Sequence, residues 1–208
     1  MSASGGNKAI IAAFLANMGI ALAKFAAWAL SGSASMLAEA VHSVADSGNQ
    51  LLLLLGGRRA KRAADQAHPF GYGRERFVYA FVVSIILFSI GGVFSIYEGV
   101  NKLTHPHMLT NWWIPVGVLV IAIVLESFSL RTAVRESNHV RLPGQSWVSF
   151  VRHSKAPELP VVLLEDVGAL VGLCFALFGV GMTVLTGNPL FDALGTLMIG
   201  VLLVAIAI

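Results

Sequence analysis

The sequence predicts an all-α membrane protein, a six-transmembrane-helix bundle with both termini on the cytoplasmic side. Of its 208 residues, 56% are hydrophobic and only 12% are charged. The apolar residues form long runs, each close to the roughly 20 residues that a helix needs to cross the hydrocarbon core of a bilayer. Six such runs cover residues of about 9–30, 33–57, 77–101, 112–133, 160–185 and 189–208.

The basic residues predict the orientation of these runs. Lys102 alone marks the loop after the third run, whereas eleven of the 14 Lys and Arg residues flank or occupy the loops after the second and fourth runs. By the positive-inside rule these two loops are cytoplasmic, and an even number of spans places both chain ends on the same side. The net charge of +3 therefore reflects topology, and we expect no nucleic-acid partner. The eleven residues are Arg58, Arg59, Lys61, Arg62, Arg74, Arg76, Arg131, Arg135, Arg141, Arg152 and Lys155.

The first run is a membrane helix and not a secretory signal peptide. It is too long, it contains Asn17 and Lys24, and no small-residue cleavage pattern follows it. The single cysteine, Cys174 in the fifth run, excludes a disulfide framework.

Short connections and small residues predict which helices pack together. The connections at 31–32 and 186–189 are so short that the first two and the last two helices should be antiparallel neighbours. In the third run, small residues recur every four positions and should allow a close approach of a neighbouring helix. These residues are Gly91, Ser95 and Gly99.

The second run carries a polar stripe on one helix face. Within it, His42 and Asp46 lie one helical turn apart and project from the same side, so that an imidazole and a carboxylate can bind one divalent metal ion. Ionisable groups at this depth cost at least a few kcal/mol each, and they usually mark a transport or catalytic pathway. The stripe consists of Glu39, His42, Asp46, Asn49 and Gln50.

Other runs add side chains that could complete such a site. Glu165 and Asp166 are adjacent in the fifth run, and together with His42 and Asp46 they are the candidate metal ligands. The alternative is that these groups only hydrogen-bond between helices, and that Asp192, near the start of the sixth run, only caps or anchors a helix. Further candidate ligands or proton-relay groups are Asn17, Glu39, Glu126 and Asp192.

A second polar cluster lies in the basic loop after the second run, which reads Asp65-x-x-His68-Pro69-Phe70-Gly71-Tyr72-Gly73. Asp65 and His68, three residues apart, could share a peripheral metal ion. The alternative is a structural turn at the membrane surface, in which the proline and the glycines fix the backbone.

Together these motifs resemble those of the cation diffusion facilitators, the zinc-transporter solute carriers. The resemblance rests on Ser31-Gly-Ser-Ala-Ser-Met-Leu-Ala-Glu39 running into His42-x-x-x-Asp46, and on the loop motif, and it extends over nearly the whole chain. It implies a six-helix domain in a lipid bilayer, usually in a homodimer, that exports Zn²⁺ from the cytoplasm in exchange for protons by alternating access. It thus implies a transporter and not an enzyme. We expect a bacterial inner membrane first and an organelle membrane second.

The resemblance also implies a ligand set. The family takes one ligand pair from its second helix, matched here by His42 and Asp46, and one from its fifth helix. Asp166 matches the second member of that pair, but the first falls on Val162, which cannot bind a metal. We expect Glu165 to replace it, as in the mitochondrial-type branch. Zn²⁺ suits this set, although a single imidazole among several oxygens also suits Mn²⁺, Fe²⁺ or Co²⁺.

In the peripheral site that the resemblance implies, Asp65 and His68 match the family, but the third position, often His, is Tyr72. The family normally also has a metal-binding cytosolic domain after its sixth helix. The sequence ends at Ile208, at the end of the sixth run, so we expect residues 1–208 to form the transmembrane domain without that cytosolic domain.

Two other function classes use the same polar residues. An intramembrane metal-dependent hydrolase would bind its metal through His42, Asp46 and Asp166, with Glu165 as general base. No other feature of the sequence indicates a substrate pocket for it. A non-transporting membrane subunit would use these side chains only to join helices.

Overall fold

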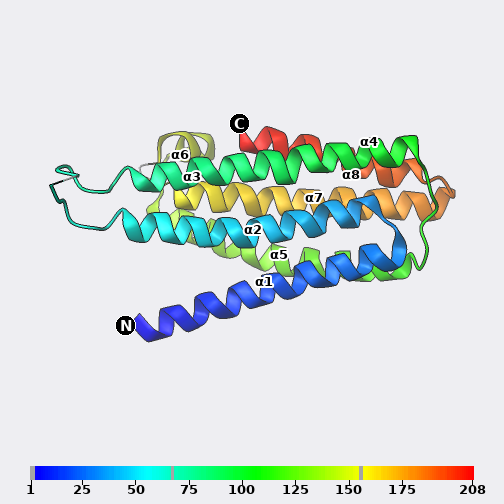
Figure 1. Cartoon of the computed structure of the whole chain (residues 1–208), viewed down its shortest axis with the longest axis horizontal. Coiled ribbons are helices and arrows are strands. Elements are labelled where there is room, and N and C mark those ends of the chain that lie inside the picture. The colour runs from blue at the N-terminus through cyan, green and yellow to red at the C-terminus, as the bar shows by residue number, and fades with distance from the viewer. Residues whose placement is uncertain (1–2, 67, 155–156) are drawn as a thin grey trace.

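Within the residues that the structure describes, every regular element is a helix. The computed structural model describes residues 3–66, 68–154 and 157–208, with side chains from residue 17 onward. The chain forms a bundle of long helices that run alongside one another (Figure 1). The elements are α1 (Ala3–Ser31), α2 (Ala34–Arg59), α3 (Glu75–Ile86), the π-helix η1 (Leu87–Val93), α4 (Phe94–Thr104), α5 (Trp113–Val140), α6 (Trp147–His153), α7 (Glu158–Thr186) and α8 (Leu190–Ala207).

The six predicted runs correspond to α1, α2, the continuous rod α3–η1–α4, α5, α7 and α8. Within the described residues, four of these are long and apolar enough to cross a membrane, namely Glu75–Thr104, Trp113–Val140, Glu158–Thr186 and Leu190–Ala207. The side chains of the first half of α1 lie outside the description, and the polar stripe of α2 lowers its hydropathy. The count of six spans stays a prediction.

The two ends of the bundle differ. The connection 60–74 and the short helix α6 lie at one end, which we call the basic end, and α1 and α8 have their chain ends directed toward it (Figure 1). At the other end, the turn end, the chain reverses at Gly32 and Gly187, which adopt φ values of 69° and 67°. A left-handed conformation costs glycine little and other residues more. The predicted antiparallel packing of α1 with α2 and of α7 with α8 is confirmed.

The small-residue face of the continuous rod α3–η1–α4 packs against α8. A Cβ atom added at Gly91 would lie 3.1 Å from Cδ1 of Leu203, and one added at Gly99 would lie 2.7 Å from Cγ of Leu197. Such distances leave little room for a side chain, so the small residues set the spacing of the two helices. The predicted close-packing face is therefore confirmed.

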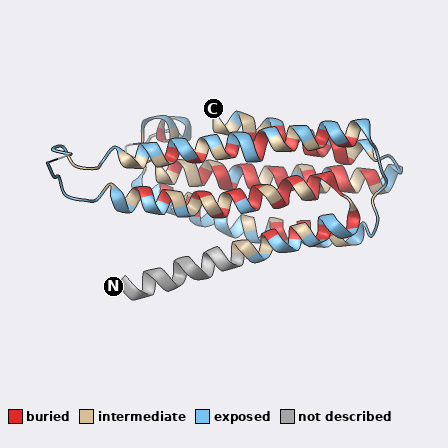
Figure 2. Cartoon of the chain, in the orientation of Figure 1, coloured by how far each residue is buried: buried red, intermediate tan, exposed pale blue. Residues whose placement is uncertain are grey.

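The burial pattern is that of a bundle with an apolar exterior. Buried residues face the inside of the bundle, and exposed ones cover its outward surfaces (Figure 2). Many exposed side chains are large and apolar, among them Phe81, Tyr97, Ile121, Phe128 and Val201. An extended apolar surface of this kind indicates contact with lipid. The buried core of Met36, Leu119, Leu173, Val180 and Ile199 lies between α2, α5, α7 and α8.

Candidate metal-ion site

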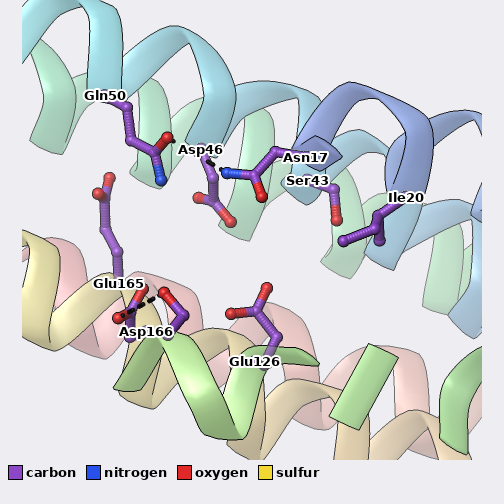
Figure 3. A pocket seen from close by; sticks show the side chains of 9 residues that line it. Asn17, Ile20, Ser43, Asp46, Gln50, Glu126, Glu165 and Asp166 are labelled. Carbon is purple, nitrogen blue, oxygen red and sulfur yellow. Dashed lines mark hydrogen bonds between the residues drawn. The ribbon is translucent and has the colours of Figure 1, made fainter. Parts of the chain in front are cut away.

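A small polar cavity of about 30 Å³ lies between α1, α2, α5 and α7. A space of this size accommodates a water molecule or an ion of similar size. Its wall contains four carboxylates from three helices and only one apolar side chain. The lining residues are Asn17, Ile20, Ser43, Asp46, Gln50, Glu126, Ser129, Glu165 and Asp166 (Figure 3).

The four carboxylates come from opposite walls. Asp46 on α2 and Glu126 on α5 point into the space from either side, while Glu165 on α7 extends toward Gln50 (Figure 3). Glu165 and Asp166 are buried, with 5% and 7% of their surface exposed. Several ionised carboxylates in a membrane interior are unfavourable unless protons or a cation neutralise them. The cavity therefore has the electrostatic character of a cation site.

Hydrogen bonds orient two of these carboxylates. The Asn49 side-chain amide donates to Oε1 of Glu165 at 2.7 Å. The Ser129 hydroxyl donates to Oδ2 of Asp166 at 3.1 Å. By contrast, Oδ1 of Asp46 is buried and has no hydrogen-bond partner among the described residues. Asp46 is thus the lining carboxylate that has a buried oxygen without a hydrogen bond among the described residues.

His42 lies behind Asp46 and is not among the residues that line the cavity. Its side chain is 1% exposed, and its Nε2 lies 3.4 Å from Oδ2 of Asp46. On its other side the ring faces η1, where a Cβ atom at Gly91 would lie 3.7 Å from Nδ1. Neither ring nitrogen has a hydrogen-bond partner within the described part of the chain. The structure therefore places the imidazole next to the cavity, in contact with it through Asp46.

The α7 residues are divided between two environments. Val162 packs with the apolar cluster of Leu53, Ala80 and Val83, whereas Glu165 lines the cavity beside Asp166. The structure thus brings Glu165, and not the residue at 162, together with Asp46.

The side chains around the cavity do not form a compact metal cage. In the part of the chain that the structure describes, no three His, Cys, Asp or Glu side chains lie close enough together to hold a metal ion. An ion that bound to this cavity would have to draw its carboxylates together.

Of two other candidate residues, Glu39 has its partner outside the cavity and Asn17 lines the cavity. Glu39 is fully buried and forms an ion pair with Lys24, with Oε2 and Nζ 3.0 Å apart. Asn17 does line the cavity, where its amide donates to Oε1 of Gln50 at 3.2 Å. The sequence analysis missed Ser129 as a lining residue, although its position three residues after Glu126 places it on the same face of α5.

Asp192 lies in the first turn of α8, but it caps the N-terminus of α2. At the turn end, its carboxylate accepts hydrogen bonds from the Ser33 hydroxyl and the Ala34 backbone N–H, both at 2.8 Å. Lys102 Nζ lies 3.8 Å from Oδ2 of Asp192. These contacts cap the N-terminus of α2 and hold it against α8, so the structure places Asp192 away from the cavity residues.

The loop motif forms a compact exposed turn. Asp65 accepts hydrogen bonds from the His68 backbone N–H at 2.7 Å and from the Tyr72 hydroxyl at 2.6 Å, one on each carboxylate oxygen. The rings of His68 and Tyr72 are in contact, with centroids 4.1 Å apart. The hydrogen bond to Asp65 raises the pKa of Tyr72. These contacts engage the carboxylate that a peripheral metal ion would need.

The chain is similar to a known domain family and to proteins that include a zinc antiporter. The model of the cation efflux transmembrane domain matches residues 10–208. The human mitochondrial proton-coupled zinc antiporter SLC30A9 is 38% identical over 181 residues, which are 86% of this chain and 32% of that protein. Metal tolerance protein C4 of Arabidopsis thaliana is 32% identical over 202 residues, 97% of this chain and 44% of that protein. Magnetosome protein MamB of Magnetospira sp. (strain QH-2) is 28% identical over 94% of this chain and 61% of that protein. The chain thus spans about a third of the length of the SLC30A9 relatives.

Proposed function

Because the chain belongs to the cation efflux transmembrane domain family, we propose that it exports Zn²⁺ across a membrane in exchange for protons. The observation that carries this proposal is the gathering of Asp46, Glu126, Glu165 and Asp166 around one cavity inside the helix bundle. The family membership confirms the resemblance to the cation diffusion facilitators that the motifs indicate. It favours a transporter over the intramembrane hydrolase.

Coupling to protons follows from the ligand chemistry. A metal ion binds ionised carboxylates and neutral imidazole, so that binding displaces protons and protonation displaces the ion. In a bilayer the unoccupied carboxylates need protons to offset their burial. Alternate exposure of the cavity to the two sides of the membrane would then carry metal one way and protons the other.

We assign the transported ion to Asp46, Glu165 and Asp166, with His42 as the nitrogen ligand and Glu126 as an additional carboxylate. Oδ1 of Asp46 and the two ring nitrogens of His42 are buried without a hydrogen bond among the described residues, which supports this assignment. Binding would bring the carboxylates together and turn the imidazole past Asp46 toward the ion. The names of the SLC30A9 relatives support zinc as the substrate, and the oxygen-rich set also accepts Mn²⁺, Fe²⁺ or Co²⁺.

The proposed topology has six spans, with both chain ends and the basic end on the cytoplasmic or matrix side. The positive-inside rule supports it. That rule applies equally to a bacterial inner membrane and to an organelle membrane, and the mitochondrial relatives favour the latter. The family resemblance supports a homodimer.

The proposal is tested by metal flux into proteoliposomes that contain an internal pH dye. Wild-type protein should move Zn²⁺ with an opposite movement of protons, and Asp46→Asn should abolish both. Asp65→Asn is the matched control, since it makes the same change in an exposed loop, and it should transport normally. Undiminished transport by Asp46→Asn would contradict the proposal.

A further inference from the structure

We propose that Lys24 determines the metal affinity of the cavity, because its ammonium group occupies the Glu39 carboxylate and withholds it from the transported ion. The inference rests on the proposed function, since it presumes that a cation enters the cavity. It assigns a role to a buried ion pair that lies next to the proposed metal ligands without being one of them.

The pair lies against the turn-end side of the cavity. Lys24 on α1 is 1% exposed, and its Nζ lies 3.0 Å from Oε2 of Glu39 on α2. Nζ also donates a hydrogen bond to the hydroxyl of Ser43 at 2.7 Å, and Ser43 lines the cavity together with Ile20. Lys24 and Glu39 are each one helical turn farther toward the turn end than these two lining residues. One turn beyond the pair, Ala27 and Met36 belong to the closed apolar core.

Only one of the two Glu39 carboxylate oxygens, Oε2, is paired with Lys24. The other oxygen, Oε1, is buried and has no hydrogen-bond partner among the residues described. This oxygen faces α7 at Gly172, where a Cβ atom would lie 2.7 Å from it. The glycine therefore makes room for a carboxylate that, among the side chains described, is neutralised only by Lys24.

The Lys24 charge also acts on the cavity itself, since it interacts electrostatically with Asp46 and Glu126. Charges in a weakly polar interior interact far more strongly than in water. A divalent ion in the cavity is therefore repelled by the ammonium group and cannot use Glu39 while the pair holds. Loss of Lys24 removes the repulsion and releases a fifth carboxylate, so both effects strengthen metal binding.

Loss of Glu39 acts in the opposite direction. Without its partner, the Lys24 ammonium would stay next to the cavity as an uncompensated positive charge. The two single substitutions should therefore change metal affinity with opposite signs, and the double substitution should restore it. An ion pair that only joins α1 to α2 would give no such pattern, since either substitution would loosen the same contact.

The test is a titration of the purified protein with Zn²⁺ by calorimetry. We expect Lys24→Met to bind Zn²⁺ on the order of tenfold more tightly, and Glu39→Gln on the order of tenfold more weakly, than the wild type. The double variant Lys24→Met/Glu39→Gln should return close to the wild-type affinity. Lys24→Arg keeps the positive charge and should also stay close to it.

A second buried pair provides the matched control. Lys102 and Asp192 lie 3.8 Å apart at the turn end and are 1% and 0% exposed. Lys102→Met should leave zinc affinity unchanged, whatever it does to stability.

The inference is overturned if Lys24→Met behaves like Lys102→Met, or if the two single substitutions shift affinity in the same direction. If Lys24→Met does not fold, unweakened binding by Glu39→Gln overturns it alone. A wild-type protein that binds no Zn²⁺ refutes the proposed function together with this inference.

Discussion

The amide of Asn49 donates a 2.7 Å hydrogen bond to Oε1 of Glu165, which joins α2 to α7 beside the polar cavity. Both side chains are buried, and the second Asn49 polar atom, Oδ1, has no partner among the described residues. The orientation of one lining carboxylate therefore depends on the helix that carries Asp46. Any relative movement of α2 and α7 would change both carboxylates together.

Removal of this hydrogen bond should weaken metal binding. Residues that orient a metal ligand typically contribute about 10- to 100-fold to affinity, so we expect a loss of that order for Asn49→Ala in a zinc titration. Asn101→Ala is a suitable control, because it makes the same change at an exposed residue of α4 outside the cavity. Equal affinities for Asn49→Ala and wild type would show that Glu165 is not oriented in this way, or is not a ligand.

Asp192 should matter for stability and not for metal binding. Asp192→Asn removes the charge opposite Lys102 and replaces one acceptor at the start of α2 by a donor. Breaking a buried ion pair costs about 3 kcal/mol or more. We therefore expect a lower free energy of unfolding in a denaturant titration and an unchanged zinc affinity. A strong loss of affinity in the folded variant would instead assign Asp192 to the metal pathway.

Zinc affinity should fall as the pH is lowered. Protons compete with the ion for the carboxylates and the imidazole, so the metal-free protein binds more protons than the metal-bound protein. Acid therefore favours release, and alkaline conditions favour binding until the ligands are fully deprotonated. Calorimetry in buffers of different ionisation enthalpy gives the number of protons displaced, which should be smaller for Asp46→Asn. A pH-independent affinity would be incompatible with proton exchange at these ligands.

The loop of Asp65, His68 and Tyr72 should bind no metal of its own. Both Asp65 oxygens accept hydrogen bonds within the turn, so we expect Asp65→Asn to leave the amount of bound zinc unchanged. The same substitution removes the partner that raises the pKa of Tyr72. Ultraviolet titration of the phenol should therefore show its pKa moving down toward the ordinary value. If Asp65→Asn bound one zinc ion fewer than the wild type, the loop would be a peripheral metal site and this prediction would be wrong.

The sequence predicted the helices and much of the cavity, because both depend on local patterns. Long apolar runs give the helices, and residues one turn apart share a side, which placed His42 in contact with Asp46. The same rule does not say which side of α2 faces α1, α5 and α7, so the position of the imidazole behind the carboxylate required the tertiary structure. Capping of α2 by Asp192 joins residues 158 positions apart and has no local signal.

Two further features depend on packing between helices. The π-helix Leu87–Val93 contains Gly91 and Gly92, which weaken an α-helix but do not specify a π-helix. The pairing of Lys24 with Glu39 depends on the register of α1 against α2, which the short turn restricts but does not determine. Such registers follow from side-chain packing across the whole bundle.

The central claim is that the cavity carboxylates hold the transported ion. Its most direct test is the number of zinc ions bound per chain, measured by equilibrium dialysis of the wild type, of Asp46→Asn/Asp166→Asn and of the loop control Asp65→Asn. We predict a single ion per chain in the wild type and the control, and none in the double variant at the same free zinc concentration. A double variant that remains folded and still binds zinc as the wild type does would contradict the claim.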